Sequence, residues 1–342
     1  TSHDGLPPRS PRTGSSSPPT SSPNEPVITR FALANPLGAR LRWLPRPAVA
    51  GVLTAGAASG PAALGAQNAA PPPAASPVPA VRDTIITAPS LAPRKPLPSE
   101  RATAKITKFS FIAYGDTRGR FDGTALQVEH GMVVDAMLGT IKRSAATSDP
   151  IRFVLQSGDA VVNGSIATQL NVSYIPLINR LTQEGGVPYL LAVGNHDVGS
   201  ATDPAGIRRI DGLHNYFATN ARLIPATGSK HRLTGYPTYA FGYGNTFFIA
   251  FDSDIPDDSV QFAWVKAQLE GLDRGRYRNI AVFCHHPAFS SGPHGGPRVE
   301  TQAASVRARW MPLFRRHHVR LLLTGHEHLY EHWVERYTDA TG

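Results

Sequence analysis

Side chains that can bind metal ions follow five separate apolar runs of the sequence. They are Asp116 and Asp159 in two GD dipeptides, Asn195 in GNHD, His285 in HHP, and His326 with His328 in GHEH. Carboxylate, amide oxygen and imidazole ligands together suit Mn²⁺, Fe or Zn²⁺, and the sequence does not choose among these ions. Each motif alone has an ordinary explanation, because Asp and Asn also cap helices or form turns and single histidines are common. Capping gives no reason for histidines after two of the runs, so the five motifs together predict a metal site.

The apolar runs that precede these motifs predict β-strands. FSFIAYGD, IRFVLQSGD, VPYLLAVGNHD, RNIAVFCHHP and VRLLLTGHEH are separated by stretches with helical periodicity, and YPTYAFGYGNTFFIAFDSD predicts a hairpin that turns at Gly244-Asn245. The pattern indicates an α/β fold with an inserted antiparallel pair, and residues 200–235 look like a long polar loop. Loops that follow the carboxyl ends of parallel strands share one edge of a sheet, so the motif residues should converge there.

The composition divides the chain into two parts. Residues 1–104 are rich in Pro, Ala, Ser and Gly and predict a disordered leader, whereas residues 105–342 predict one catalytic domain that begins near Lys105. The leader holds 10 Lys and Arg against 4 Asp and Glu, which leaves 24 against 21 for the remainder, so most of the net charge of +9 lies in the leader. No basic stripe with interleaved aromatic residues occurs in the predicted domain, which argues against a specific nucleic-acid partner. The sequence does not set the oligomeric state.

The leader also contains the features of an export signal. Arg40, Arg42 and Arg46 precede an Ala/Gly-rich apolar stretch that ends in small residues near Ala66, and a Pro/Ala spacer follows at 69–80. We therefore expect an exported protein, periplasmic or secreted. A disordered Ala/Pro tail is the alternative. The stretch is poor in Leu and Ile and is interrupted by Pro61, so no stable membrane span is expected.

The order and spacing of the motifs resemble the calcineurin-like metallophosphoesterase superfamily over residues 109 to about 333, with GNHD and GHEH as the most specific blocks. The first block lacks the DxH histidine and is similar to the purple acid phosphatase branch. GDAVVNG differs from the GDxVDRG block of Ser/Thr protein phosphatases, which disfavours that activity. The resemblance implies an α/β sandwich of two mixed β-sheets flanked by helices, with two divalent metal ions as cofactors. It also implies hydrolysis of a phosphorylated small molecule or other phosphoester, phosphomonoesters being favoured over diesters and nucleotides.

The same resemblance implies a role for each motif residue. Asp159 bridges the ions, Asp116 and His328 complete the first site, and a metal-bound hydroxide is the nucleophile. The remaining ligands belong to the second site: Asn195, His285 and His326. His196 and His294 would contact the substrate and protonate the leaving group, and Asp197 would orient His196 or a ligand imidazole. His285 matches the ligand position of HHP better than His286, because neighbouring strand residues point to opposite sides.

Two residues depart from the family pattern at the first ion. Arg118 occupies the position of the DxH histidine, where it would bind a phosphate oxygen or form a surface ion pair, and Val162 stands in place of the tyrosine ligand of purple acid phosphatases. A purple absorption band is therefore not expected. Asn163 could supply an amide oxygen or only a turn, and His130 is a nearby histidine without an assigned role. We expect one tightly bound and one weakly bound ion.

Several alternatives remain open from the sequence. A noncatalytic metal- or phosphate-binding protein on the same scaffold would explain the altered first site, and binding of a polyanion by the basic leader is a third reading. The sequence stops soon after GHEH, where family members continue through at least one more strand, so a truncated C-terminus is an expectation. Cys284, the single cysteine, is expected to be a buried inert residue rather than a reactive nucleophile.

Overall fold

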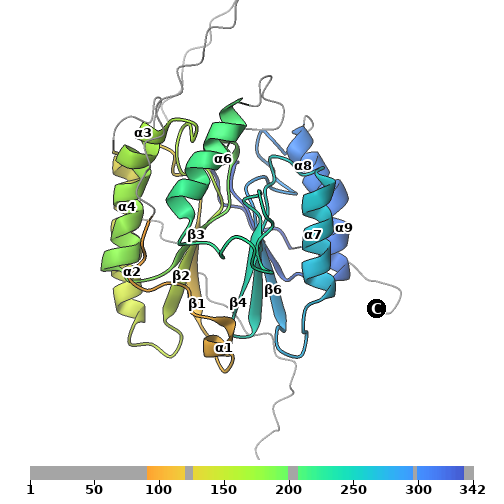
Figure 1. The fold of residues 1–342 in the computed structure, drawn as a ribbon, viewed down its shortest axis with the longest axis horizontal. Helices are drawn as coiled ribbons and strands as arrows, with labels where there is room; N and C mark the ends of the chain where they lie inside the picture. The colour runs from red at the N-terminus through yellow and green to blue at the C-terminus, as the bar shows by residue number, and fades with distance from the viewer. Residues whose placement is uncertain (1–90, 120–125, 199–206, 296–298, 335–342) are drawn as a thin grey trace, which may run out of the picture.

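The computed structural model describes residues 91–119, 126–198, 207–295 and 299–334. Two β-sheets pack face to face, and helices cover the outer face of each sheet (Figure 1). The predicted export signal and the Pro/Ala spacer lie outside the described residues and stay predictions. Within the described residues, no helix is both long enough and apolar enough to cross a membrane.

The first sheet contains the three strands that precede the GD, GD and GNHD motifs. β1 (Ser110–Tyr114), β2 (Ile151–Gln156) and β3 (Tyr189–Leu191) pair in that order, and both pairings are parallel. Phe153 and Val154 in β2 are fully buried, as expected for a strand covered on both faces. Parallel pairing brings the carboxyl ends of all three strands to the same edge. In the described residues this sheet is purely parallel rather than mixed.

The second sheet contains the predicted hairpin and the two strands that precede the histidine motifs. β4 (Tyr239–Tyr243) and β5 (Thr246–Ala250) are antiparallel and turn at Gly244-Asn245, which confirms the predicted hairpin. β5 pairs in parallel with β6 (Asn279–Phe283), and β6 with β7 (Leu321–Leu323). The predicted α/β sandwich of two sheets flanked by helices is confirmed.

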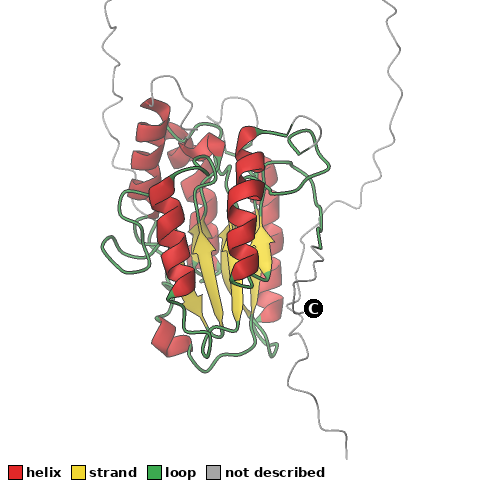
Figure 2. Ribbon diagram, turned by 90° about the vertical axis from the view of Figure 1, so that its right-hand side faces the viewer, coloured by secondary structure: helices red, strands yellow, loops and turns green. Residues whose placement is uncertain are grey.

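The helices form the two outer layers and lie alongside the strands (Figures 1 and 2). Those on the side of the first sheet are α2 (Val128–Ser144), α3 (Ala167–Gln169), η1 (Leu170–Tyr174), α4 (Ile175–Asn179), η2 (Arg180–Glu184), α5 (Asn195–Val198) and α6 (Ile207–Asn220). Those on the side of the second sheet are α7 (Ser259–Glu270), α8 (Thr301–Ser305), η3 (Val306–Trp310) and α9 (Met311–Arg316). The η segments are wider π-helical turns, and η1 and η3 lead into α4 and α9, which carry a proline in their first turn. Proline has no N–H to continue the regular helical hydrogen bonding, which is consistent with the altered turn beside it.

Aromatic side chains from both sheets form the layer between them. The ring centroid of Phe153 in β2 lies 5.5 Å from that of Phe111 in β1, and 5.2 Å and 5.6 Å from those of Phe248 and Phe241 in the second sheet. Edge-to-face and stacked pairs of this kind add about 0.5–1.5 kcal/mol each beyond the area they bury. The aromatic layer therefore fixes the two sheets relative to each other, and with them the two groups of metal-binding motifs.

Two expectations from the sequence need correction. Residues 91–104, assigned to the leader, pack on the domain: Leu91 is buried and donates its backbone N–H to Thr219, while α1 (Glu100–Thr103) lies beside β4. The expected polar loop at 200–235 contains the helix α6, in which Tyr216 is buried and donates a hydrogen bond to the carbonyl of Leu191. Leu91 owes its placement to contacts with distant residues, whereas α6 has apolar residues at helical spacing, Ile207, Ile210, Leu213 and Phe217, which predict a helix.

Candidate metal centre

All six predicted metal ligands lie together at the carboxyl ends of the strands. Three follow strands of the first sheet and three follow strands of the second: Asp116, Asp159, Asn195, His285, His326 and His328. Nε2 of His285 lies 3.0 Å from Oδ1 of Asn195 and 3.1 Å from Nδ1 of His326, which connects the two sheets. The site therefore spans both sheets rather than the edge of a single one.

The second set of predicted ligands consists of Asn195, His285, His326 and the shared Asp159. One acceptor atom from each of these four residues faces the others. Nδ1 of His285 lies 3.0 Å from the carbonyl oxygen of Ser157, to which it donates, so in a neutral ring Nε2 carries a lone pair. That Nε2 faces Oδ1 of Asn195, Nδ1 of His326 and, at 3.4 Å, Oδ1 of Asp159. Facing lone pairs repel each other unless a cation or a proton lies among them. The donor set fits a divalent ion that accepts nitrogen and oxygen ligands.

The pKa of His285 also indicates that the surrounding carboxylates favour positive charge at this position. Burial is the largest influence and lowers this pKa, but the carboxylates of Asp159 and Asp116 outweigh it, and the pKa is raised.

The first set of predicted ligands consists of Asp116, His328 and the shared Asp159. It has fewer ligand atoms than the second set and is more exposed. One carboxylate oxygen of Asp116, one of Asp159 and a ring nitrogen of His328 lie within 4.8 Å of one another. Oδ1 of Asp116 also accepts the backbone N–H of His326 at 2.8 Å, and the His328 side chain is 50% exposed. Burial is the main cause that raises the pKa of Asp116 in the metal-free protein. The three donors fit a cation but leave its coordination incomplete.

Four of the predicted ligands adopt an unusual backbone conformation. Their φ angles are positive: 57° for Asp116, 54° for Asp159, 76° for His326 and 54° for His328. Residues with a Cβ atom rarely occupy this region, and such strain is concentrated at functional sites. A glycine directly precedes Asp116, Asp159 and His326 in the two GD blocks and in GHEH, and it gives room for this turn. At Gly325, for example, an added Cβ atom would collide with the Asp116 carboxylate.

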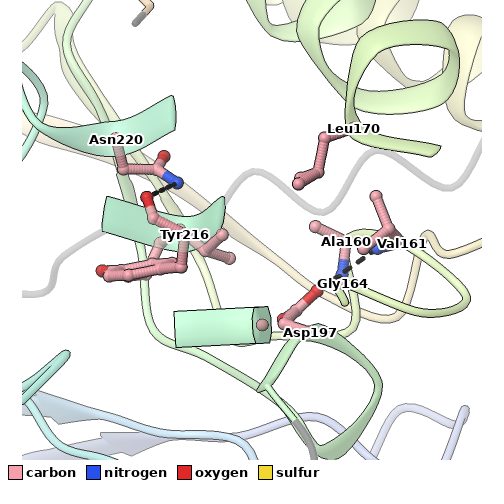
Figure 3. A pocket seen from close by; sticks show the side chains of 9 residues that line it. Ala160, Val161, Gly164, Leu170, Asp197, Tyr216 and Asn220 are labelled. Atoms are coloured by element: carbon pink, nitrogen blue, oxygen red, sulfur yellow. Dashed lines mark hydrogen bonds between the residues drawn. The ribbon is translucent and has the colours of Figure 1, made fainter. Parts of the chain in front are cut away.

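His196 and Asp197 lie beside the predicted ligands. The hydrogen bonds described for Asp197 come from backbone N–H groups, whereas the sequence predicted a contact with His196 or with a ligand imidazole. Nδ1 of His196 lies 2.7 Å from the carbonyl oxygen of Val162, to which it donates, and Nε2 lies 4.0 Å from Oδ2 of Asp159. The buried Asp197 carboxylate accepts backbone N–H groups of Gly194 and Asp159 at Oδ2 and of Ala160 at Oδ1. Figure 3 shows the Asp197 side chain directed at Ala160 and Val161. Burial is the largest cause that raises the pKa of Asp197 to about 7. The contacts described for Asp197 hold the two metal-binding loops together.

Two glutamates that the sequence reasoning missed contact predicted site histidines. Oε2 of Glu300 lies 2.6 Å from Nε2 of His326. Oε1 of Glu327 accepts the backbone N–H of His294 at 2.9 Å, and Oε2 lies 3.5 Å from its Nδ1. Glu327 stands inside GHEH and could have been noticed there, whereas no motif marks Glu300. His294 lies near the second set, with its ring centroid 4.4 Å from that of His326.

His286 lies beside the second set rather than on the far side of its strand. His286 is buried, and its ring centroid lies 4.4 Å from that of His326. One ring nitrogen of His286, one of His326 and one carboxylate oxygen of Glu300 lie within 4.8 Å of one another. Oγ of Ser253 accepts the backbone N–H groups of His285 and His286 and lies 3.0 Å from Nδ1 of His286. Burial lowers the pKa of His286 well below its usual value. His286, Glu300 and His326 thus form a further candidate group for a metal ion beside the predicted ligands.

Arg118 contacts the predicted bridging carboxylate. Its Nε atom lies 3.5 Å from Oδ2 of Asp159. Of the two roles considered for Arg118, the described structure therefore shows an ion pair, although a deeply placed one, since the Asp159 side chain is only 2% exposed.

The side-chain contacts described for Asn163, His130 and Cys284 do not involve the six predicted ligands. Oδ1 of Asn163 accepts the backbone N–H and hydroxyl of Ser165, which is a turn contact. His130 is buried between Tyr114 and Gln127, and burial lowers its pKa to about 4. Cys284 is fully buried and its pKa is raised by that burial, which leaves an unreactive thiol.

Comparison with known proteins identifies the family of the chain. The family model of calcineurin-like phosphoesterases matches residues 109–330, so the chain belongs to the calcineurin-like phosphoesterase family. Two proteins of Mycobacterium tuberculosis, MT2654 and Rv2577, are each 27% identical over 157 residues, which make up 42% of this chain and 27% of theirs. The chain thus spans about a quarter of the length of these relatives.

Two of the solved structures that are similar to part of this chain are a purple acid phosphatase and a phosphopantetheinyl hydrolase. The purple acid phosphatase PPD1 of yellow lupin has a TM-score of 0.45 and 16% identity, over 63% of this chain and 37% of the lupin chain. The phosphopantetheinyl hydrolase PptH of Mycobacterium tuberculosis has a TM-score of 0.37 and 14% identity, over 65% of this chain and 84% of that one.

Proposed function

We propose that this chain is a metal-dependent hydrolase of phosphate esters, with phosphomonoesters favoured over diesters and nucleotides, and that it binds two divalent cations. The observation that carries the proposal is the convergence of six donors from both sheets on one another, four of them at strained backbone positions. Membership of the calcineurin-like phosphoesterase family supports the same reaction class.

The residues around the donors have separate tasks in this proposal. Asn195, His285 and His326 hold one ion, Asp116 and His328 hold the other, and Asp159 contacts both. Two divalent ions of Mn, Fe or Zn, when bound, stabilise the charge on the phosphoryl oxygens and lower the pKa of water toward neutrality, which makes it a nucleophile. The chain itself contributes positioning of the substrate and transfer of protons.

His196 and His294 are the candidates for proton transfer to the leaving group. His196 is anchored through Nδ1 to Val162, and its Nε2 lies on the side of the predicted ligands, 4.0 Å from Oδ2 of Asp159. Glu327 contacts both the backbone N–H and Nδ1 of His294, which leaves Nε2 of His294 for the substrate. Asp197 acts as a positioning residue, since it links the loops that carry Asp159 and Asn195 through backbone N–H groups.

The proposal is tested by turnover of p-nitrophenyl phosphate and its bis ester with Mn²⁺, Zn²⁺ or Fe²⁺. The wild-type chain is expected to release p-nitrophenol in a metal-dependent manner, faster from the monoester, and Asp159→Ala is expected to abolish release. Asp135→Ala is the matched control, because Asp135 is an exposed carboxylate paired with Arg180. Metal uptake without turnover of either ester would instead support a noncatalytic metal- or phosphate-binding protein, the alternative that the Arg118–Asp159 ion pair favours.

A further inference from the structure

A permanent cation lies against the carboxylate that the two sets of donors share. Nε of Arg118 is 3.5 Å from Oδ2 of Asp159, and the side chains are 28% and 2% exposed. This Nε is buried and has no hydrogen-bond partner within the described ranges of the chain. Because the pair is shielded from water, its electrostatic attraction is stronger than that of an ordinary surface ion pair.

The two oxygens of Asp159 face different groups. Oδ1 accepts the backbone N–H of His196 at 3.0 Å and lies 3.4 Å from Nε2 of His285, on the side of the second set. Oδ2 faces Arg118 and lies 4.0 Å from Nε2 of His196. A cation in the first set would therefore share the charge of Asp159 with the guanidinium of Arg118.

The first set has little to compensate for this sharing. Its donors in the described part of the chain are Asp116, Asp159 and the half-exposed His328. Arg118 itself cannot be a ligand, because a guanidinium does not lose its proton in proteins. The side chains of Asn163 and His130, the other two candidates, are bonded to other residues.

We propose that the guanidinium of Arg118 supplies a permanent positive charge next to the first set of ligands. It weakens binding of an ion there by repulsion and by holding Asp159, so that the resting protein retains one ion tightly, in the second set. The guanidinium also binds the phosphoryl oxygens of the substrate, a part of the inference that rests on the proposed function. A planar guanidinium can bind two phosphate oxygens at once, whereas an ammonium group cannot do so with the same geometry.

Metal content tests the first part without reference to turnover. The purified wild-type chain and its Arg118→His and Arg118→Lys variants are loaded with Mn²⁺ or Zn²⁺, desalted and analysed by mass spectrometry for metal per chain. We expect about one retained ion for wild type and Arg118→Lys and about two for Arg118→His, which removes the charge and supplies an imidazole ligand. Wild type that retains two ions, or a folded Arg118→His variant that gains none, overturns the proposal.

A second variant covers the case in which Arg118→His fails to fold. Arg118→Gln removes the charge without adding an imidazole, so calorimetric titration should show the first ion binding at least about tenfold more tightly than in wild type. An unchanged affinity in Arg118→Gln overturns the proposal as well. Circular dichroism confirms that each variant is folded.

Binding of inorganic phosphate tests the second part. In metal-loaded protein, Arg118→Lys is expected to bind phosphate about tenfold more weakly than wild type, because it loses the planar pair of donors. Equal affinity of wild type and Arg118→Lys refutes phosphoryl binding by Arg118. A chain that shows the expected metal and phosphate binding but hydrolyses no ester refutes the proposed function alone, whereas an active wild type with two tight ions refutes only the role of Arg118.

Discussion

Oε2 of Glu300 lies 2.6 Å from Nε2 of His326, and the other nitrogen of that ring, Nδ1, faces Nε2 of His285 at 3.1 Å. A carboxylate that accepts the N–H of a metal-binding imidazole fixes the ring and its tautomer and increases the basicity of the ligand nitrogen. Glu300 therefore sets Nδ1 of His326 as the atom for the second ion.

Removal of the Glu300 carboxylate should weaken binding of the second ion. We expect Glu300→Ala to lower its affinity about 10- to 100-fold, the usual effect of losing such a partner, with a smaller effect in Glu300→Gln, which keeps an acceptor oxygen. Isothermal titration with Zn²⁺ or Mn²⁺ measures the change. Glu184→Gln is a suitable control, because Glu184 is an exposed residue that pairs with Arg180. Equal metal affinity in wild type and Glu300→Ala would contradict the assignment.

Glu327 and His294 should act together on turnover and leave metal binding intact. Replacing a positioned proton donor usually costs about 10²- to 10⁴-fold in kcat, and we expect His294→Ala to fall in that range. Glu327→Ala should lose a similar factor, because it removes the contacts to both Nδ1 and the backbone N–H of His294. Glu327→Gln retains an acceptor for the backbone N–H and should be less impaired. If Glu327→Ala loses metal instead of kcat, the role in proton transfer is wrong.

Asp197 should matter for stability as well as for the site. Its buried carboxylate accepts the backbone N–H groups of Gly194, Asp159 and Ala160, and Asp159 and Ala160 are themselves buried. Each buried donor left unpaired costs about 1–3 kcal/mol, so Asp197→Ala should lower the free energy of unfolding by about 3–5 kcal/mol. Urea denaturation of the metal-free protein measures this loss separately from any loss of bound ions. A change below about 1 kcal/mol would show that the loops do not depend on these bonds.

The stability of the metal-free protein should fall in mild acid because of His130. Burial lowers its pKa from 6.5 to about 4, so the unfolded chain binds a proton that the folded protein refuses between these values. The contribution is complete above pH 6.5 and is lost as the pH falls toward 4, by up to about 3 kcal/mol at 1.36 kcal/mol for each pKa unit.

Urea denaturation at several pH values between 4 and 7.5, with chelator present, checks this dependence. His130→Gln removes the titrating ring and should flatten the curve in that window by one proton, whatever its effect on stability at pH 7.5. A variant curve parallel to the wild-type curve would exclude His130 as the cause.

The local signals of the sequence were sufficient for the strands and for the six donors. A continuous apolar run that ends in glycine and a polar residue specifies both a buried strand and the turn after it, so β1, β2 and β3 and the residues that follow them could be predicted one motif at a time. The apolar spacing of Ile207, Ile210, Leu213 and Phe217 would also have indicated helix α6 within the expected loop. The packing of Leu91 could not be predicted in this way, because it depends on a contact with the distant residue Thr219.

The sequence by itself determined which residues can bind a cation and at which strand ends they lie, because residue type and short-range spacing fix both. Only the tertiary structure decided which of these residues meet. The aromatic layer around Phe153 holds two sheets face to face, and their combined edge brings Glu300 to His326, Glu327 to His294 and Arg118 to Asp159. Those contacts depend on how separate loops close over the sheet ends, and long-range packing of this kind leaves no periodicity or spacing in the chain to be read beforehand.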